Sequence, residues 1–225
     1  MLGVFEFRRL VIVTGTPGVG KTDFSRMLAK RIGATHIDLG KFAETQKSIA
    51  AFDRKRRSRI VDLRRMSAEF RKLLSAVRGT IVVDGHYAVD VVPTNLVRMV
   101  FVLRCDPEKL ERRLRQRGFP EAKIRENVTA EILDICLWDS IESCKRSRVS
   151  ELNTTDMSKQ EILAEALKVL EGKKPPLIGV VDWLGSLEEK DKLNNFLSYA
   201  GRTSRRFALA QKERSSRTRR KMEVS

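Results

Sequence analysis

The sequence is short of cysteine, has no long apolar run, and has too few acidic residues to balance its basic ones. Its three cysteines include no CxxC pair and leave one thiol over, which argues against a zinc site and against a disulfide framework. This usage indicates a reducing, intracellular compartment. No stretch reads as a signal peptide or as a membrane span. We therefore expect a cytoplasmic protein that makes no membrane contact.

The excess of basic residues, a formal net charge of +16, is concentrated in three windows. Residues 51–72 carry nine Lys and Arg against three acids, residues 104–125 carry eight against four, and residues 201–225 carry nine against two. Such clusters are typical of surfaces that bind anions or nucleic acid. A solvated helix face remains the alternative for the first window. We expect RNA contact through residues 51–72 and 202–225, with the latter disordered until it is bound.

The most specific motif is a glycine-rich loop in the segment LVIVTGTPGVGKTDFSRML, which begins at Leu10. A buried strand is predicted before the loop and a helix after it, and the loop itself has the pattern GxxxxGK[ST]. In that context the backbone amides and the helix N-terminus bind phosphates, Lys21 reaches the β- and γ-phosphates, and the Thr22 hydroxyl holds Mg²⁺. An ordinary glycine-rich turn is the alternative. The loop predicts an ATP site at Gly15, Gly18, Val19, Gly20, Lys21 and Thr22.

Strands and helices alternate along the chain, which predicts an α/β fold with a central parallel sheet of about five strands covered by helices on both faces. Strands are predicted at residues 10–14, 35–38, 80–84, 98–104 and 152–154. Helices are predicted from the glycine loop to residue 31, and over residues 40–49, 60–77, 107–117, 121–145 and 159–170. Ile60 and Trp138 fall on the predicted core faces of two of these helices.

Asp84 and His86 form a second candidate for the site, at the end of the strand predicted over residues 80–84. In open α/β sheets ligands bind beyond the carboxyl ends of the strands, so Asp84 should emerge beside the loop and hold Mg²⁺ directly or through water. His86 could orient a water or the transferred phosphoryl group, because an imidazole titrates near neutral pH. A structural role for this histidine is the alternative.

Four arginines follow on the helix predicted over residues 107–117, and such charge on a short segment can meet the charge that develops on a γ-phosphate. Residues four positions apart share a helix face. This spacing favours Arg113 and Arg117 over Arg112 and Arg115.

The chain resembles the adenylate kinase isoenzyme 6 family, the CINAP-type nucleotide kinases of eukaryotes and archaea, over about residues 9–172. The resemblance is carried, in order, by TGTPGVGKT, HIDLG, IVVDGH, VFVLRCDPEKLERRLRQRGF and IRENVTAEI. It implies a P-loop nucleoside monophosphate kinase core over residues 1–172, with an acceptor-binding insert at about 38–65 and a lid at about 116–126. It also implies ATP, AMP and Mg²⁺ as ligands, adenylate kinase and ATPase activity, and a role in small ribosomal subunit maturation with a ribosomal protein as partner.

Residue by residue, the resemblance implies roles for few positions beyond the loop motif. The family's nucleotide loop falls on Gly18, Gly20, Lys21, Thr22 and Asp23, its DxH motif on Asp84 and His86, its lid arginine on Arg117, and the glycine that opens its acceptor domain on Gly40. The chain departs from the family at Asp23, where relatives usually have Thr, and after Gly40, where an acid and an arginine are lost. Residues 54–59 are basic here and acidic in relatives. ATP binding is therefore better supported than AMP acceptance.

The resemblance ends at residue 172, and the Pro175-Pro176 pair that follows predicts a linker. Residues 173–201 are expected to be partly helical, and they carry enough apolar side chains to dock on the chain's own core or on a partner, with the core favoured. Three functions follow as hypotheses: a nucleotide kinase, a ribosome-assembly ATPase that uses water as acceptor, and a small-metabolite kinase of the same fold.

Overall fold

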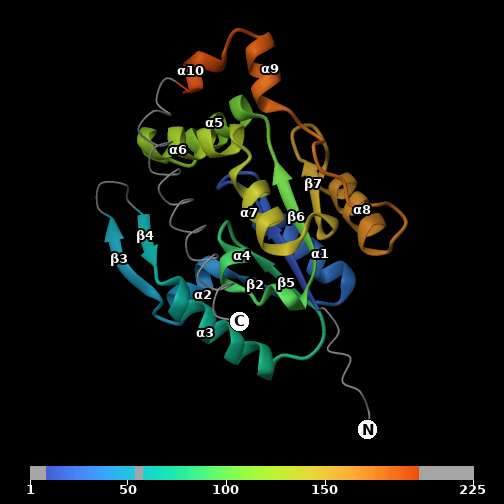
Figure 1. The fold of residues 1–225 in the computed structure, drawn as a ribbon. Helices are drawn as coiled ribbons and strands as arrows, with labels where there is room; N and C mark the ends of the chain where they lie inside the picture. Colours follow the sequence, from blue (N-terminus) through green and yellow to red (C-terminus); the bar gives the residue numbers. More distant parts are fainter. Residues whose placement is uncertain (1–8, 54–57, 198–225) are drawn as a thin grey trace, which may run out of the picture. The chain divides into compact units, whose positions relative to one another are not determined.

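The fold is built on a five-stranded parallel sheet with the strand order β2-β5-β1-β6-β7 (Figure 1). The computed structural model describes residues 9–53 and 58–197, without the side chains of residues 52, 53, 58, 59 and 197. Each neighbouring pair of strands in this sheet runs parallel, as the alternation of elements predicts. The strands are β1 (Leu10–Thr14), β2 (Thr35–Asp38), β5 (Ile81–Asp84), β6 (Val97–Arg104) and β7 (Val149–Asn153).

The chain builds the sheet outward from β1, which pairs with β5 on one side and β6 on the other. The loop after β1 therefore lies where the winding direction changes, the position at which open α/β sheets form their ligand crevice. The register places Asp84 opposite both Val13 of β1 and Asp38 of β2. The carboxyl ends of three strands thus meet beside the glycine loop.

Helices cover both faces of the sheet (Figure 1). One face packs against α1 (Lys21–Ile32) and α8 (Lys159–Leu170), with Phe24 and Phe101 in an edge-to-face contact at 6.3 Å between ring centroids. The other face packs against α7 (Ile135–Cys144) and α4 (Ala88–Val91), and α3 (Leu63–Ala76) packs against α4. The fully buried valines, leucines and isoleucines of the strands form the core between these layers, and their burial drives the folding of the sheet.

Several helix ends lie at, or within one residue of, the predicted positions. Gly33 ends α1 in the left-handed conformation, at φ 64°. Asp106 caps α5 (Pro107–Gln116) by accepting from the backbone N–H of Lys109. Ser158 and Glu161 form a capping box at the start of α8. Strand β7 begins at Val149, three residues before the predicted start.

The structure contradicts the prediction that residues 40–49 form one helix and that residue 60 begins another. Helix α2 (Leu39–Thr45) ends early, where Lys47 adopts a left-handed φ of 49°. Strands β3 (Ile49–Asp53) and β4 (Ser58–Val61) then pair antiparallel in a separate two-stranded sheet. Ile60 lies in β4 with 50% of its surface exposed, so its placement in the core was wrong. The apolar run at residue 49 fits either periodicity, and its pairing with the next segment of the chain decides for a strand.

The long helix predicted over residues 121–145 is also wrong, because it is broken into α6 (Glu121–Ile132) and α7. Asp134 lies at the break with a left-handed φ of 54°, and its carboxylate pairs with the buried Arg104. The break rotates the residues that follow. Trp138, which the unbroken periodicity places in the core, has 52% of its surface exposed.

The contacts within the chain divide it into two units, residues 1–183 and 184–225. The described part of the second unit holds most of α9 (Trp183–Glu189) and all of α10 (Leu193–Leu197). The predicted basic tail, residues 202–225, and most of the basic segment 54–59 lie outside the described residues. Within the described ranges, none of the helices is both long and apolar enough to cross a membrane.

Candidate nucleotide-binding site

The glycine loop between β1 and α1 has a backbone that excludes side chains at two positions. Gly15 and Gly18 have φ values of 135° and 101°, and a Cβ atom would lie 2.5 Å from the carbonyl oxygen of Leu103 at Gly15 and 2.8 Å from Leu110 Cδ1 at Gly18. Gly20, at φ 103°, has no atom within 4 Å of its Cβ position and so faces open space. The loop is therefore tightly packed at Gly15 and Gly18 and open at Gly20, where a phosphate could approach.

Lys21, the first residue of α1, turns its side chain back over this loop. Its Nζ donates to the backbone carbonyl of Gly15 at 2.7 Å and to that of Thr16 at 3.0 Å. Burial lowers the pKa of the Lys21 amine, while the carboxylates of Asp84 and Glu131 act in the opposite direction. The ammonium group thus lies at the mouth of the loop, where it can bind an anion.

Thr22 and Asp84 lie together at the end of the central strands. The Thr22 hydroxyl donates to Asp84 Oδ2 at 2.8 Å, and only 3% of the Asp84 surface is exposed. A hydroxyl and a carboxylate are the oxygen donors that Mg²⁺ takes in such sites, with the remaining positions left to water and substrate phosphates. In the described ranges there is no group of three or more His, Cys, Asp or Glu side chains that could hold a metal alone. The donor set fits Mg²⁺ held jointly with a nucleotide.

His36 is a member of this cluster that the sequence did not predict. Its Nε2 lies 2.5 Å from Asp84 Oδ1, the carboxylate oxygen that Thr22 does not contact. Strand β2 places it there by pairing with β5 in a register that sets His36 opposite Val82, two residues before Asp84. The only sequence signal is its position near the end of a predicted strand, and that signal says nothing of which strand lies next to it.

A pocket of about 340 Å³ opens beside the loop. Arg113 lies on it with Nη1 3.3 Å from Cys105 Sγ, and Arg117 lies on it as the C-cap residue of α5. Arg115 is instead paired with Glu111 and Glu121 at 2.8 and 3.2 Å. The other residues that line the pocket are Gly18, Val19, Gly20, Asp23, Phe24, Leu103, Thr154, Met157, Ser158, Lys159 and Ile162. An apolar floor with polar groups at its rim suits a nucleoside.

Asp23, at which the chain departs from the family pattern, is paired at the rim of this pocket. Its Oδ2 lies 2.7 Å from Lys159 Nζ, the first residue of α8. The hydrogen bond from Lys159 lowers the pKa of the Asp23 carboxyl. The negative charge of Asp23 is thus balanced by Lys159, which belongs to a different helix.

His86 lies on the loop that follows β5, with its ring exposed and in edge-to-face contact with Tyr87 at 4.4 Å between centroids. Desolvation by the surrounding protein, together with the positive charges of Lys21 and Lys123, lowers the pKa of the imidazole from its ordinary value. The sequence argument assumed a ring that titrates near neutrality. A lowered pKa favours the neutral form of the ring at pH 7.

Gly40, the predicted acceptor-site residue, lies on a different element from the glycine loop. Its backbone N–H donates to Asp38 Oδ1 at 2.9 Å, and Asp38 thereby caps α2. Strand β2 pairs in parallel with β5, and Gly40 comes two residues after the end of β2. Gly40 therefore lies near the same carboxyl end of the sheet as Asp84. The structure therefore brings together the loop residues, Thr22 and Asp84, places Arg117 on the adjoining pocket, and places Gly40 along the same edge.

Comparisons with known proteins agree with this architecture. A family model described as an AAA domain matches residues 11–134. A protein of Methanocaldococcus jannaschii named "Putative adenylate kinase" is 35% identical over 173 residues, which cover 77% of this chain and 92% of that protein. Proteins of the same name from Thermococcus onnurineus and Saccharolobus solfataricus are 31% and 33% identical and are covered over 97% and 95% of their lengths.

A solved structure supports the fold alone. Shikimate kinase from Acinetobacter baumannii in complex with shikimate matches with a TM-score of 0.54 at 16% identity, over 76% of this chain and 97% of that one. The α/β P-loop kinase fold predicted from the sequence is thereby confirmed.

Proposed function

The chain belongs to the P-loop family of these archaeal relatives, and we propose that it is a nucleoside monophosphate kinase that uses Mg²⁺-ATP and transfers the γ-phosphoryl group to AMP. The observation that carries the proposal is the meeting of three features at one sheet edge: the open glycine loop, the Thr22–Asp84 pair, and a nucleoside-sized pocket with Arg117 at its rim. The names of the relatives and the resemblance to the adenylate kinase isoenzyme 6 family support AMP as the acceptor.

In this proposal the chain acts by positioning and by electrostatic stabilisation. The loop amides and Lys21 bind the phosphates, and Lys21 exchanges the carbonyls of Gly15 and Thr16 for phosphate oxygens. Thr22 and Asp84 would hold Mg²⁺, which neutralises charge on the β- and γ-phosphates when it is bound. Arg117 meets the charge that develops on the transferred group, and neutral His86 orients the acceptor side by hydrogen bonding.

The test is ADP formation from Mg-ATP with and without AMP, at low salt. We expect AMP to accelerate the reaction and two ADP to form for each ATP consumed. K21A should lower turnover by at least about a hundredfold, because it removes a charge aimed at the transferred phosphate. K30A is the matched control, since Lys30 is an exposed lysine in the last turn of the same helix. Undiminished turnover by K21A would refute the assignment.

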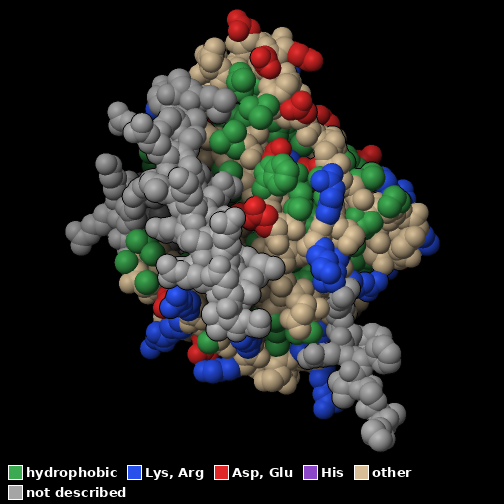
Figure 2. Space-filling view, in the orientation of Figure 1, with side chains coloured by type: hydrophobic (Ala, Val, Ile, Leu, Met, Phe, Trp, Pro, Cys, Tyr) green, Lys and Arg blue, Asp and Glu red, His purple; other side chains and the backbone are tan. Residues whose placement is uncertain are grey.

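We infer a second candidate, an ATPase with water as acceptor that binds RNA or a small-subunit ribosomal protein, from the basic surface on α3. Arg64, Arg65 and Arg71 are exposed there, and Lys and Arg side chains predominate over acids where α3 reaches the surface (Figure 2). Surface arginines of this kind bind phosphates and release counterions.

This candidate predicts slow ATP hydrolysis that AMP does not change, and RNA binding that weakens steeply as salt is raised. Replacing Arg64, Arg65 and Arg71 together by Ala should reduce the slope of that salt dependence. Binding that does not respond to salt would count against it, and AMP-stimulated ADP formation would return the assignment to the kinase.

A further inference from the structure

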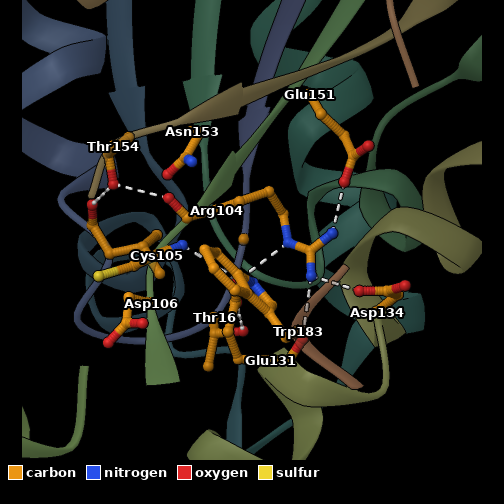
Figure 3. Close-up of polar contacts among 12 residues, drawn as sticks. Thr16, Arg104, Cys105, Asp106, Glu131, Asp134, Glu151, Asn153, Thr154 and Trp183 are labelled. Atoms are coloured by element: carbon orange, nitrogen blue, oxygen red, sulfur yellow. Dashed lines mark hydrogen bonds and ion pairs between the residues drawn. The ribbon is translucent and has the colours of Figure 1, made fainter. Parts of the chain in front are cut away.

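A cluster of ion pairs around the buried Arg104 has no part in the mechanism proposed above (Figure 3). Arg104, at the end of β6, is 2% exposed and pairs with Glu131 of α6, Glu151 of β7 and Asp134. Its Nε lies 2.9 Å from Glu131 Oε1, and its Nη2 donates to the backbone carbonyl of Glu131 at 3.0 Å. Arg104, Glu131 and Glu151 are buried while the Asp134 side chain is partly exposed, and burying such charges is costly unless each of them is well satisfied.

Glu131 connects this cluster to the glycine loop. Its Oε2 accepts from the Thr16 hydroxyl at 2.6 Å, and the backbone carbonyl of Thr16 in turn accepts from Lys21 Nζ at 3.0 Å. Both Thr16 and Glu131 are almost fully buried, with 1% and 2% of their surfaces exposed. The position of Glu131 therefore fixes the residue that follows the first glycine of the loop.

The other carboxylate oxygen of Glu131, Oε1, accepts a hydrogen bond from a side chain in the C-terminal part of the chain. Trp183 Nε1 donates to Glu131 Oε1 at 3.2 Å, and the Trp183 side chain is 8% exposed (Figure 3). Cys105 also donates its backbone N–H to this oxygen, at 3.1 Å. A single carboxylate thus links Trp183 to Thr16, two residues that are far apart in the sequence.

Residues 177–183, which we call the strap, are held along β7 by a second carboxylate of the same cluster. The backbone N–H of Glu151 donates to the carbonyl of Leu177 at 2.8 Å, and the Glu151 carboxylate accepts the backbone N–H groups of Gly179 and Val180. The strap is therefore fixed at its start by Glu151 and at its end by Glu131, and Arg104 joins the two carboxylates.

We propose that Trp183 is a positioning residue that acts through Glu131 on the glycine loop, so that the strap sets the affinity of the site for Mg-ATP. The inference rests on the proposed ATP site. A phosphate-binding loop works by aiming backbone amides before the ligand arrives, and small displacements of those amides weaken binding. The indole N–H is one of three donors to Glu131 Oε1, with Arg104 Nε and the Cys105 backbone N–H, and it helps to hold the carboxylate that accepts from Thr16.

The test compares W183F with W138F by calorimetric titration with Mg-ATP, at a temperature where circular dichroism shows each variant folded. Phe keeps an aromatic ring but removes the indole donor together with part of the buried volume, and Trp138 is the exposed second tryptophan of the chain. We expect W183F to raise the dissociation constant by about threefold to tenfold and W138F to leave it unchanged. Equal affinities of W183F and the wild type would overturn the inference.

A double-mutant cycle with Thr16 separates positioning from a general loss of stability. T16V should weaken Mg-ATP binding and T16S should retain it, since Ser keeps the hydroxyl that Glu131 accepts. If Trp183 acts through Glu131, T16V/W183F should lose little more affinity than T16V alone. Additive losses would overturn the inference.

Fluorescence gives an independent signature, because W138F leaves Trp183 as the one tryptophan of the chain. Its emission should change as Mg-ATP saturates, and an unchanged spectrum at saturation would contradict the link. Lack of Mg-ATP binding by the wild type would refute the proposed function and this inference together. Normal wild-type binding with an unaltered W183F refutes this inference alone.

Discussion

At the scale of single residues, the glycines of the nucleotide loop have different structural reasons for being glycine. A side chain at Gly18 would collide with Leu110 and Leu114, whereas one at Gly20 would enter open space. Both have a positive φ. Packing therefore explains the glycine at position 18, and room for an approaching ligand explains the glycine at position 20.

This difference predicts that two alanine variants will differ in how much stability and how much Mg-ATP affinity they lose. G18A should lower the free energy of unfolding by about 2–4 kcal/mol, from left-handed strain and overpacking together. G20A should cost only the strain, about 1–2 kcal/mol, but should lose Mg-ATP affinity. Urea unfolding and calorimetric titration measure the two effects. G33A, which carries the same kind of strain far from the loop, is the control for stability, and a G18A as stable as G33A would contradict the packing argument.

The second residue-scale prediction concerns the pH dependence of His86. Its pKa is lowered in the folded protein, so between the ordinary value near 6.5 and the lowered value the unfolded state binds more protons. Stability should therefore fall as the pH falls below about 6.5. The chain has two histidines, so imidazole NMR signals can be followed directly and assigned with H86Q. A midpoint for His86 at or above 6.5 would contradict the shift.

The sequence could predict only those site residues that a local pattern carries. Lys21 and Thr22 follow from the loop motif, and Asp84 follows from the end of a strand. His36, Glu131 and Trp183 were not predicted as part of the site, because each reaches it through strand pairing or a tertiary hydrogen bond. No spacing rule relates residues 16, 131 and 183.

At the scale of elements, the errors of prediction lie where a distant partner overrides local periodicity. The apolar pattern runs unbroken from α6 into α7, yet Asp134 leaves the helical conformation and pairs with Arg104. Residues 49–61 show a similar override at short range: their apolar pattern is short, and the antiparallel pairing of β3 with the neighbouring β4 decides for a hairpin. Helix α8, which a capping box begins, has the predicted bounds, residues 159–170.

The break at Asp134 yields an element-scale prediction. D134A should destabilise the fold by about 1–3 kcal/mol, because it leaves a buried arginine with one partner fewer and keeps the left-handed backbone. D134N should cost less, since Asn tolerates that backbone and still accepts a hydrogen bond. Thermal unfolding measures both, and E142A, an exposed acid on α7, is the control. A D134A variant as stable as E142A would show that the pairing with Arg104 contributes nothing.

At the scale of the whole molecule, the alternation of elements predicted a parallel sheet covered by helices, but it did not predict the order of the strands. The first unit extends to residue 183, beyond the Pro175-Pro176 pair at which a linker was predicted. Prolines predict a linker, and here the chain beyond them returns to the sheet through Glu151 and Glu131.

Two truncations test this organisation. A chain that ends after Leu197 keeps Trp183 and should bind Mg-ATP as the full chain does. A chain that ends after Pro176 should bind it at least threefold more weakly, about the lower limit for loss of one network contact, and should unfold at a lower temperature. Equal affinity and stability of the two would contradict a role for the strap in the first unit.

The contact between Leu177 and Glu151 has a further consequence for how the molecule behaves at high concentration. Strand β7 is an edge of the five-stranded sheet, and a bare edge offers its backbone groups to the strands of other chains. The carbonyl of Leu177 accepts one of those groups, the backbone N–H of Glu151, and Val180 donates its backbone N–H to the carboxylate of the same residue. Loss of the strap is therefore expected to leave more of this edge open to pairing with strands of other chains.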